Sequence, residues 1–234
     1  AEVDAVGLRS FVDKSMLQAS PSSYSMHDLL RQYASEKLAV DEISNRQVRD
    51  AHSAYYLERM PERASRLKSA QRSATLNEMD AEINDLQAAW KWACAQGLIL
   101  QLARSLEGLT LYYEMRVRYK EGSQACMEGL SAIPDNPEPS PEAEVLRARL
   151  LLLRASFLVL SGDLEIAHQL VEQGGTLLDQ LEAQGADVRR PRARYWMLDG
   201  DAQTELKTKL ACNQRGFQLY QSLGEPWRQA ELLI

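Results

Sequence analysis

The segments FVDKSMLQ, at residues 11–18, and YSMHDLLRQYA, at residues 24–34, decide the fold that we expect for the start of the chain. Residues 15–18 are predicted to form one strand, and residues 24–26, at the start of the second segment, are predicted to return as its partner strand. The Ser- and Pro-rich residues 20–23 between them are typical of a turn. From Asp28 onward, apolar residues recur at helical spacing, so a helix should begin where the hairpin ends. Helix, hairpin and helix in that order make the second half of a winged helix.

The remainder of the chain is helical by pattern, and no alternating strand pattern appears outside the hairpin. Four prolines between residues 134 and 141 cannot continue a helix, so this stretch should be a loop. One helix is expected to bend at Pro61. The predicted helices cover residues 28–40, 45–66, 74–96, 98–115, 117–133, 141–160, 164–183, 189–202, 205–223 and 227 onward.

These helices come in pairs, and glycines recur 38 residues apart at Gly162 and Gly200. The pairs resemble a lengthened tetratricopeptide (TPR) array. The residues that carry this resemblance are Leu106, Leu109, Thr110 and Tyr113 in one helix, and Gly122, Cys126 and Pro134 in the next. The small residues Thr110 and Gly122 should let these two helices approach closely, with Tyr113 in the seam, whereas Arg154 in the following unit departs from the pattern. An array of this kind presents a concave face suited to a protein or peptide partner.

The triplet Met26-His27-Asp28, placed between hairpin and helix, resembles the winged-helix domain of the STAND ATPases, the signal-transduction ATPases related to NB-ARC proteins. The segment LNEMDAEINDLQAAW at residues 76–90 resembles one that precedes the repeats in bacterial STAND regulators. The predicted fold is therefore all-α: a partial winged helix with a small β-hairpin, then an α-solenoid of TPR-like helical hairpins. The predicted domains are a partial winged-helix domain at residues 1–40, an arm-like helical connector at 41–97, and a TPR-like sensor domain at 98–234.

The resemblance implies a switch in which His27 contacts the β-phosphate of ADP and holds a resting state. Its site would be completed by an upstream nucleotide-binding domain of the same chain, which would hold ADP or ATP with Mg²⁺. The repeats would bind an inducer, whether a protein, a peptide or a small molecule. Binding would allow ADP to exchange for ATP and the activated parent to oligomerise. A histidine that only caps or packs at the junction is the alternative. Asp28 is expected to be an N-cap or first-turn acid, and Met26 to pack in the hairpin.

Two other groups of residues are candidates for a functional surface. Tyr112, Arg116 and Tyr119 cluster near one helix end and are predicted to line a partner surface. The tryptophans and tyrosines of the helices are otherwise expected to pack in the core. The basic run at residues 189–194 should be a solvated helix start or a partner contact. The net charge of −6 argues against nucleic acid as the partner of the chain as a whole.

The composition and the absence of certain motifs exclude several classes of function for this chain. No Gly-x-x-x-x-Gly-Lys-Ser/Thr loop or catalytic set is present, so we predict no enzyme activity and no cofactor for this chain alone. No metal-ligand spacing and no membrane-length apolar run occur. The three cysteines, Cys94, Cys126 and Cys212, should be buried reduced thiols in a cytoplasmic protein. The ends of the sequence suggest a fragment of a longer protein. The alternatives to the switch are a TPR-type interaction adaptor and a fragment of a DNA-binding transcriptional regulator.

Overall fold

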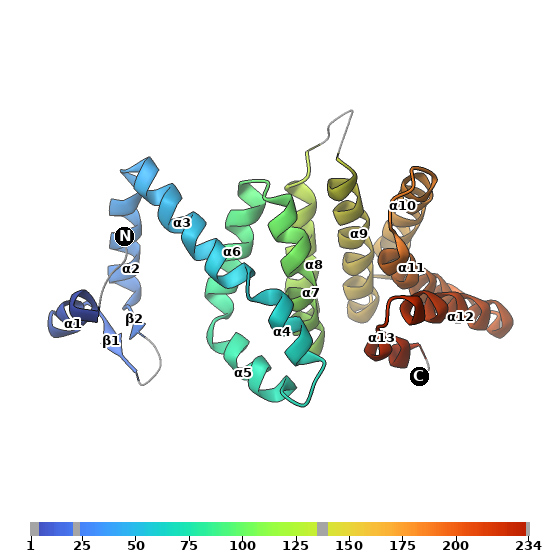
Figure 1. Ribbon diagram of the computed structural model, residues 1–234, viewed down its shortest axis with the longest axis horizontal. Helices are drawn as coiled ribbons and strands as arrows, with labels where there is room; N and C mark the ends of the chain where they lie inside the picture. The colour runs from blue at the N-terminus through green and yellow to red at the C-terminus, as the bar shows by residue number, and fades with distance from the viewer. Residues whose placement is uncertain (1–4, 21–23, 135–139, 233–234) are drawn as a thin grey trace. The chain divides into compact units, whose positions relative to one another are not determined.

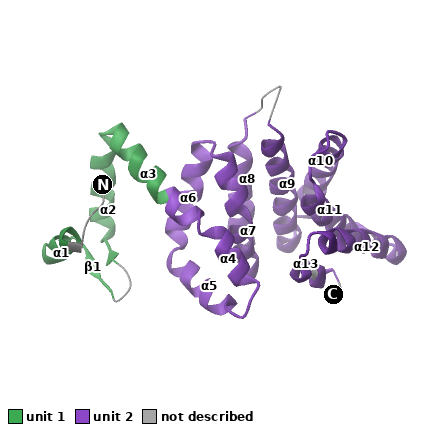
Figure 2. Ribbon diagram, in the orientation of Figure 1, with its two compact units in different colours: residues 1–52 green, residues 53–234 purple. Residues whose placement is uncertain are grey.

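The computed structural model describes residues 5–20, 24–134 and 140–232, and it divides into two compact units, residues 1–52 and 53–234 (Figure 2). The described residues form an all-α protein with paired helices and one small antiparallel hairpin, as predicted at this level (Figure 1). The elements that begin in the first unit are α1 (Ala5–Asp13), β1 (Gln18–Ala19), β2 (Tyr24–Ser25), α2 (Asp28–Ala39) and α3 (Glu42–Leu57). Helix α3 continues into the second unit. The predicted domain boundaries after residues 40 and 97 stay predictions.

The hairpin is shorter than its sequence pattern suggested. Gln18 pairs with Ser25 and Ala19 with Tyr24. The strand predicted from residue 15 is wrong at its start, because Ser15 adopts a left-handed backbone with a φ of 56°. The amide of Ser15 donates to the Val12 carbonyl at 2.9 Å, so these residues close the end of α1 instead of extending. Most of the predicted turn, at residues 21–23, lies outside the described residues.

The described residues of the first unit enclose no core. None of them is buried, and large apolar side chains remain exposed, from 41% for Phe11 to 84% for Val40. The exposed set comprises Val6, Phe11, Met16, Tyr24, Leu29, Tyr33, Val40, Ile43 and Val48. Isolated exposed apolar residues are ordinary on a folded protein, but so many in one short segment are not.

The second unit is a series of helix pairs. Its helices are α4 (Met60–Leu67), α5 (Arg72–Ala81), α6 (Ile83–Ala95), α7 (Ile99–Met115), α8 (Tyr119–Ser131), α9 (Pro141–Ser161), α10 (Leu164–Ala183), α11 (Arg189–Ala202), α12 (Leu206–Ser222) and α13 (Pro226–Glu231). The most extensive packing joins α9 with α10, α11 with α12, α8 with α9 and α4 with α7 (Figure 1). Continuous clusters of buried aliphatic and aromatic side chains hold these pairs together.

Two helices predicted as continuous are each broken in two. The predicted helix 45–66 ends at Leu57, and α4 starts at Met60, so the break precedes Pro61 instead of being a bend at it. Pro61 lies in the first turn of α4, where its missing N–H removes no helical hydrogen bond. The predicted helix 74–96 is interrupted at Glu82, whose φ of −108° and ψ of 7° leave the helical region.

The packing of α8 corrects one expectation about the repeats. A Cβ placed on Gly122 would lie 2.5 Å from Cζ of Phe157, a fully buried residue of α9. Gly122 therefore permits the close approach of α8 to α9, and not that of α7 to α8. The indole of Trp90, on α6, donates to the Ala125 carbonyl at 2.9 Å and ties α6 to α8. Trp90 and Tyr113 are buried in the core, as predicted.

The loop predicted between residues 134 and 141 leads into α9. Residues 135–139 lie outside the described residues. Ser140 is the N-cap of α9, since its Oγ accepts a hydrogen bond from the amide of Ala143 at 3.2 Å. Pro141 occupies the first helical position, the one at which proline is favoured.

Candidate functional site

His27 lies at the junction of the hairpin and α2, where the sequence placed it. It is the N-cap residue of α2, and its Nδ1 accepts a hydrogen bond from the amide of Leu29 at 3.3 Å. A ring nitrogen that accepts carries no proton, so the proton of the neutral imidazole is on Nε2. The side chain is exposed. His27 therefore caps a helix and also offers an unhindered N–H beside the positive end of the helix dipole.

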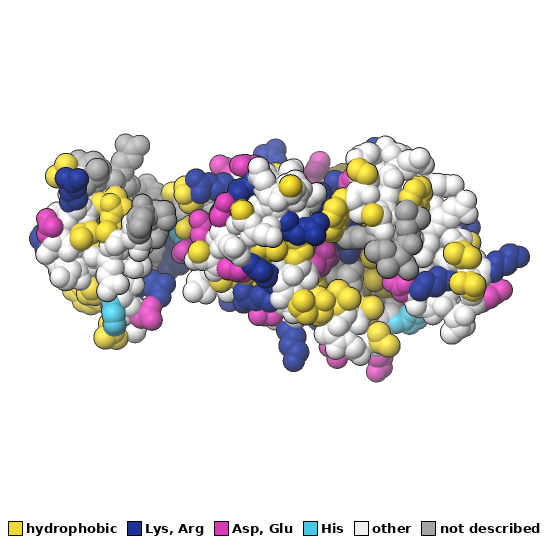
Figure 3. Space-filling model, turned by 90° about the horizontal axis from the view of Figure 1, so that it is seen from below, with side chains coloured by type: hydrophobic (Ala, Val, Ile, Leu, Met, Phe, Trp, Pro, Cys, Tyr) yellow, Lys and Arg dark blue, Asp and Glu magenta, His cyan; other side chains and the backbone are white. Residues whose placement is uncertain are grey.

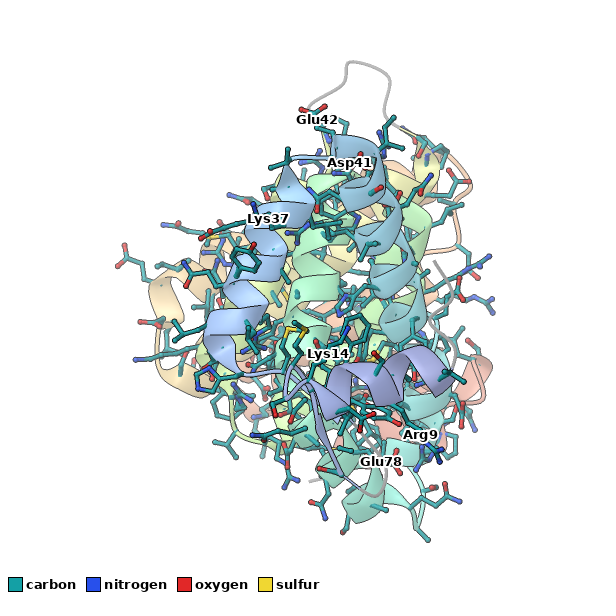
Figure 4. The ribbon with its side chains drawn as sticks, turned by 90° about the vertical axis from the view of Figure 1, so that its left-hand side faces the viewer. Arg9, Lys14, Lys37, Asp41, Glu42 and Glu78 are labelled. Atoms are coloured by element: carbon teal, nitrogen blue, oxygen red, sulfur yellow. The ribbon has the colours of Figure 1, made fainter. Side chains whose placement is uncertain are left out.

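The neighbours of His27 have local roles. Asp28 is the acidic residue of the first turn of α2 and pairs with Arg31, so it is a first-turn acid and the capping position belongs to His27. Met26 is partly buried. Figure 4 labels Lys37 near the end of α2, and Asp41 at the turn into α3. Hydrogen bonds from the hydroxyl and amide of Ser44, at 2.7 and 3.1 Å, lower the pKa of Asp41 and mark the start of α3.

The predicted partner surface around Tyr112 is wrong for that residue, because its ring is fully buried. The Tyr112 hydroxyl donates to Oδ1 of Asp80 at 2.8 Å and accepts from Arg118 at 3.1 Å. Arg116 donates to the same Asp80 through Nε at 3.1 Å, so these residues fasten α7 to α5. Tyr119 is partly buried against the core. A partner role for Arg116 and Tyr119 stays a prediction.

A cavity that the sequence did not predict lies inside the second unit. Its volume is about 40 Å³, and α7, α9, α11, α12 and α13 all contribute to its wall. We call it the inner cavity. It is lined by Glu107, Thr110, Arg149, Leu152, Leu153, Arg190, Pro191, Arg194, Tyr220, Glu225 and Arg228. Four arginines and two glutamates thus meet around a space partly walled by leucine and proline side chains.

The arginines differ in how they are partnered. Arg190 lies at the more exposed side, with 43% of its side chain accessible; it contacts Oε2 of Glu107 at 2.9 Å and also pairs with Glu225. Arg194 and Arg228 are buried, and each approaches Glu114 only to 3.6 Å. Arg194 also donates to Oγ of Ser156 at 3.0 Å. Arg149 donates to the carbonyl of Ala103 at 2.9 Å, a neutral acceptor.

The titration of the lining groups reflects these surroundings. Burial alone would raise the pKa of Glu107, but hydrogen bonds and positive charge from Lys68 and Arg190 lower it to about 2. Burial, followed by the repulsion of Arg190, lowers the pKa of Arg149 to about 10. The carboxylate is therefore strongly stabilised as an anion, whereas the guanidinium of Arg149 is poorly compensated.

The prediction of a solvated basic run at residues 189–194 is wrong for two of its four arginines, and the alternative of a partner contact stays a prediction. Arg192 and Arg194 are buried rather than solvated, and Arg192 pairs with Asp179 and Glu182 of α10 at 2.6 and 3.1 Å. Arg189 and Arg190 are both exposed at the start of α11, and Arg189 pairs with Asp187 two residues before it. The available sequence signal was arginine on apolar helices: Arg149 interrupts a leucine-rich stretch of α9, and the four-residue spacing of Arg190 and Arg194 places both on one face of α11.

Further features limit the chemistry. The three cysteines are free and buried, as predicted, and burial raises the pKa of Cys94 to about 12. Within residues 5–20, 24–134 and 140–232, no three His, Cys, Asp or Glu side chains are placed to hold a metal ion. The described helices include none with the length and apolar character needed to cross a membrane.

No family model, curated protein or solved structure matches this chain.

Proposed function

We propose that this chain is the regulatory portion of a STAND-type ATPase switch. The first unit supplies His27 to an ADP site, and the second unit binds the inducer. The observation that carries the proposal is the combination, in residues 1–52, of an exposed junction histidine with apolar surface that the described residues do not cover.

The apolar surface supports an incomplete domain. Leu29 and Tyr33 lie four residues apart on α2, on the same side of the helix, and are 71% and 58% exposed. Half of a winged helix would have this surface, since the other half and an adjoining nucleotide-binding domain would cover it. Burying such side chains contributes about 1.5–3 kcal/mol each, enough to hold a resting state together.

The geometry of His27 suits a phosphate ligand. Its Nδ1 is engaged by the Leu29 amide, which leaves Nε2–H as a donor directed away from the helix backbone. The N-terminus of α2 adds a partial positive charge at the same place. The histidine would then stabilise the ADP-bound state, and its contact would be lost when the two parts of the parent separate.

The second unit fits the sensing role. Its paired helices enclose a charged cavity, and an inducer that contacts several helices would favour one arrangement of the array over another. Such a difference in binding free energy is what shifts a switch between states. ATP, Mg²⁺ and the phosphate loop would belong to another domain of the parent, and oligomerisation to its activated form.

The test uses the full-length parent, purified and then denatured to release any bound nucleotide. His27→Ala removes both the imidazole and the helix cap. His27→Asn removes the imidazole but keeps a side chain that caps helices well. We expect the parent to release ADP, and both variants to have lost most of it. His168→Ala, which changes an exposed histidine of α10, should retain it.

The opposite outcomes are equally informative. Retention of ADP in His27→Asn with loss in His27→Ala would reduce His27 to a structural cap. Absence of nucleotide from all the proteins would favour the interaction adaptor. The DNA-binding alternative has little support on the face of the second unit seen in Figure 3, where basic and acidic side chains are interspersed. Salt-dependent retention of DNA by the chain would revive it.

A further inference from the structure

We propose that the inner cavity is an oxyanion site that takes a carboxylate or phosphate group of the ligand sensed by the second unit. The proposal rests on the sensing role given above to that unit. It concerns Arg149 and Arg194, neither of which belongs to the His27 junction.

The inner cavity carries an excess of positive charge. Four arginines and two glutamates line the cavity, an excess of two positive charges. Two charged residues flank the cavity: Lys68, which pairs with Glu107, and Glu114, which lies beside Arg194. One is positive and the other negative, so together they leave the excess at two positive charges. Buried charge of one sign is costly unless a counter-charge is supplied, so an anion in the cavity would be strongly favoured.

Two arginines of the cavity lack a short ion pair among the described residues. Arg194 stands 3.6 Å from Glu114, beyond the usual length of a charged hydrogen bond. Arg149 donates to a backbone carbonyl. Guanidinium groups offer several N–H donors in a planar fork that matches carboxylate and phosphate oxygens. Neither Arg149 nor Arg194 therefore has a close carboxylate partner, so an oxyanion in the cavity could pair with both.

The size of the inner cavity and its opening beside Arg190 suit a small anionic group. A cavity of about 40 Å³ holds a few water-sized groups, which suits the oxygens of one carboxylate or phosphate but not a whole nucleotide. Arg194 and Arg228, with 9% and 7% of their side chains exposed, form the inner wall, whereas Arg190 is 43% exposed and lies at the mouth. The rest of the ligand would extend past Arg190.

The experiment uses the chain itself. Inorganic phosphate and, separately, acetate are titrated at constant ionic strength with chloride as the balance. Binding is followed by the arginine Nε–Hε NMR resonances and by thermal unfolding. We expect saturable shifts of the Arg149 resonance and a rise in Tm with at least one of the two anions. Saturation by phosphate alone or by acetate alone identifies the group that the cavity accepts.

Matched variants decide where the anion binds. Arg149→Gln should weaken binding about tenfold, the effect of losing one charged hydrogen bond. Arg189→Gln removes the same charge from an exposed residue of α11 and should bind like the unmodified chain. Arg149→Lys keeps the charge without the fork and should bind with intermediate affinity, which preserves the test if the glutamine variant does not fold.

An equal rise in Tm in all variants, or a response to anion concentration that never saturates, would mean an adventitious ion only and would overturn the proposal. That failure would leave the His27 test untouched, because nucleotide release from the parent is measured with variants in the other unit. Conversely, a parent without ADP would not affect the response of Arg149 to phosphate or acetate.

Discussion

At the residue scale, the pKa of Glu107 is set by two opposing effects. Its side chain is only 21% exposed, and burial alone would favour the neutral acid. Lys68 and Arg190 outweigh that effect and lower its pKa to about 2. The folded protein therefore binds a proton at Glu107 less readily than the unfolded chain does.

Glu107→Gln should lower the free energy of unfolding at pH 7 by about 2 kcal/mol. Because the folded pKa lies below the ordinary value of 4.5, the contribution of Glu107 is complete above about pH 4.5. It is lost as the pH falls toward 2. Urea unfolding between pH 7 and 2.5 would show this as a difference that shrinks on acidification. Glu165→Gln, at an exposed residue of α10, is the control, and a constant difference between Glu107→Gln and the unmodified chain would contradict the assignment.

Single residues were the hardest level to predict from the sequence. The junction position of His27 followed from its neighbours, but its capping bond to the Leu29 amide required coordinates. The arginines of α11 looked solvated because their partners, Glu107 and Glu114, lie about 80 residues earlier on another helix. Local sequence carries no record of such distant pairing.

At the element scale, the contact of α8 with α9 depends on one residue without a side chain. Gly122 provides the space occupied by the ring of Phe157, which is fully buried. Glycine inside a helix is less favourable than alanine by about 1 kcal/mol, so its presence here indicates a packing requirement.

Gly122→Ala should destabilise the protein by about 1–3 kcal/mol despite the gain in helix propensity, because the new methyl group would overlap the Phe157 ring. Phe157→Leu should be destabilising by itself but should partly relieve the clash in the double variant. A double-mutant cycle by denaturant unfolding measures this coupling. Additive effects of the two substitutions would show that they do not share the contact.

Most elements could be predicted, because apolar periodicity and Gly or Pro punctuation mark their ends. The helices α9, α10 and α11 begin at the predicted residues and end within one residue of them. The two missed breaks, before α4 and at Glu82, have different causes. The break before α4 directly precedes Pro61, whose ring would clash with the carbonyl of Leu57, so the helix ends there instead of bending. The break at Glu82 coincides with no residue that breaks helices by itself.

For the whole molecule, the two units differ in how much they bury. The second unit contains extensive clusters of fully buried side chains, among them Trp90, Tyr113 and Phe157. The described part of the first unit contains none. Local stability follows buried contacts, so the two units should open to solvent at different rates.

Hydrogen exchange should reveal that difference. In the isolated chain, amides of α2 should exchange at least about 100-fold faster than those of α7, which serves as the internal reference. In the parent protein, α2 should gain protection as its apolar face is covered. Mass spectrometry of both proteins measures this directly, and equal protection of α2 and α7 in the isolated chain would contradict the view that the first unit is incomplete.

The two ion pairs of Arg190 have a mechanical consequence. Glu107 precedes Arg190 by 83 residues, and Glu225 follows it by 35, so one guanidinium spans much of the second unit along the chain. Arg190 thereby ties α11 to α7 and to Glu225, the residue just before α13. Pulling these helices apart must first separate charged groups. The force needed to do so should therefore fall as added salt screens the two ion pairs.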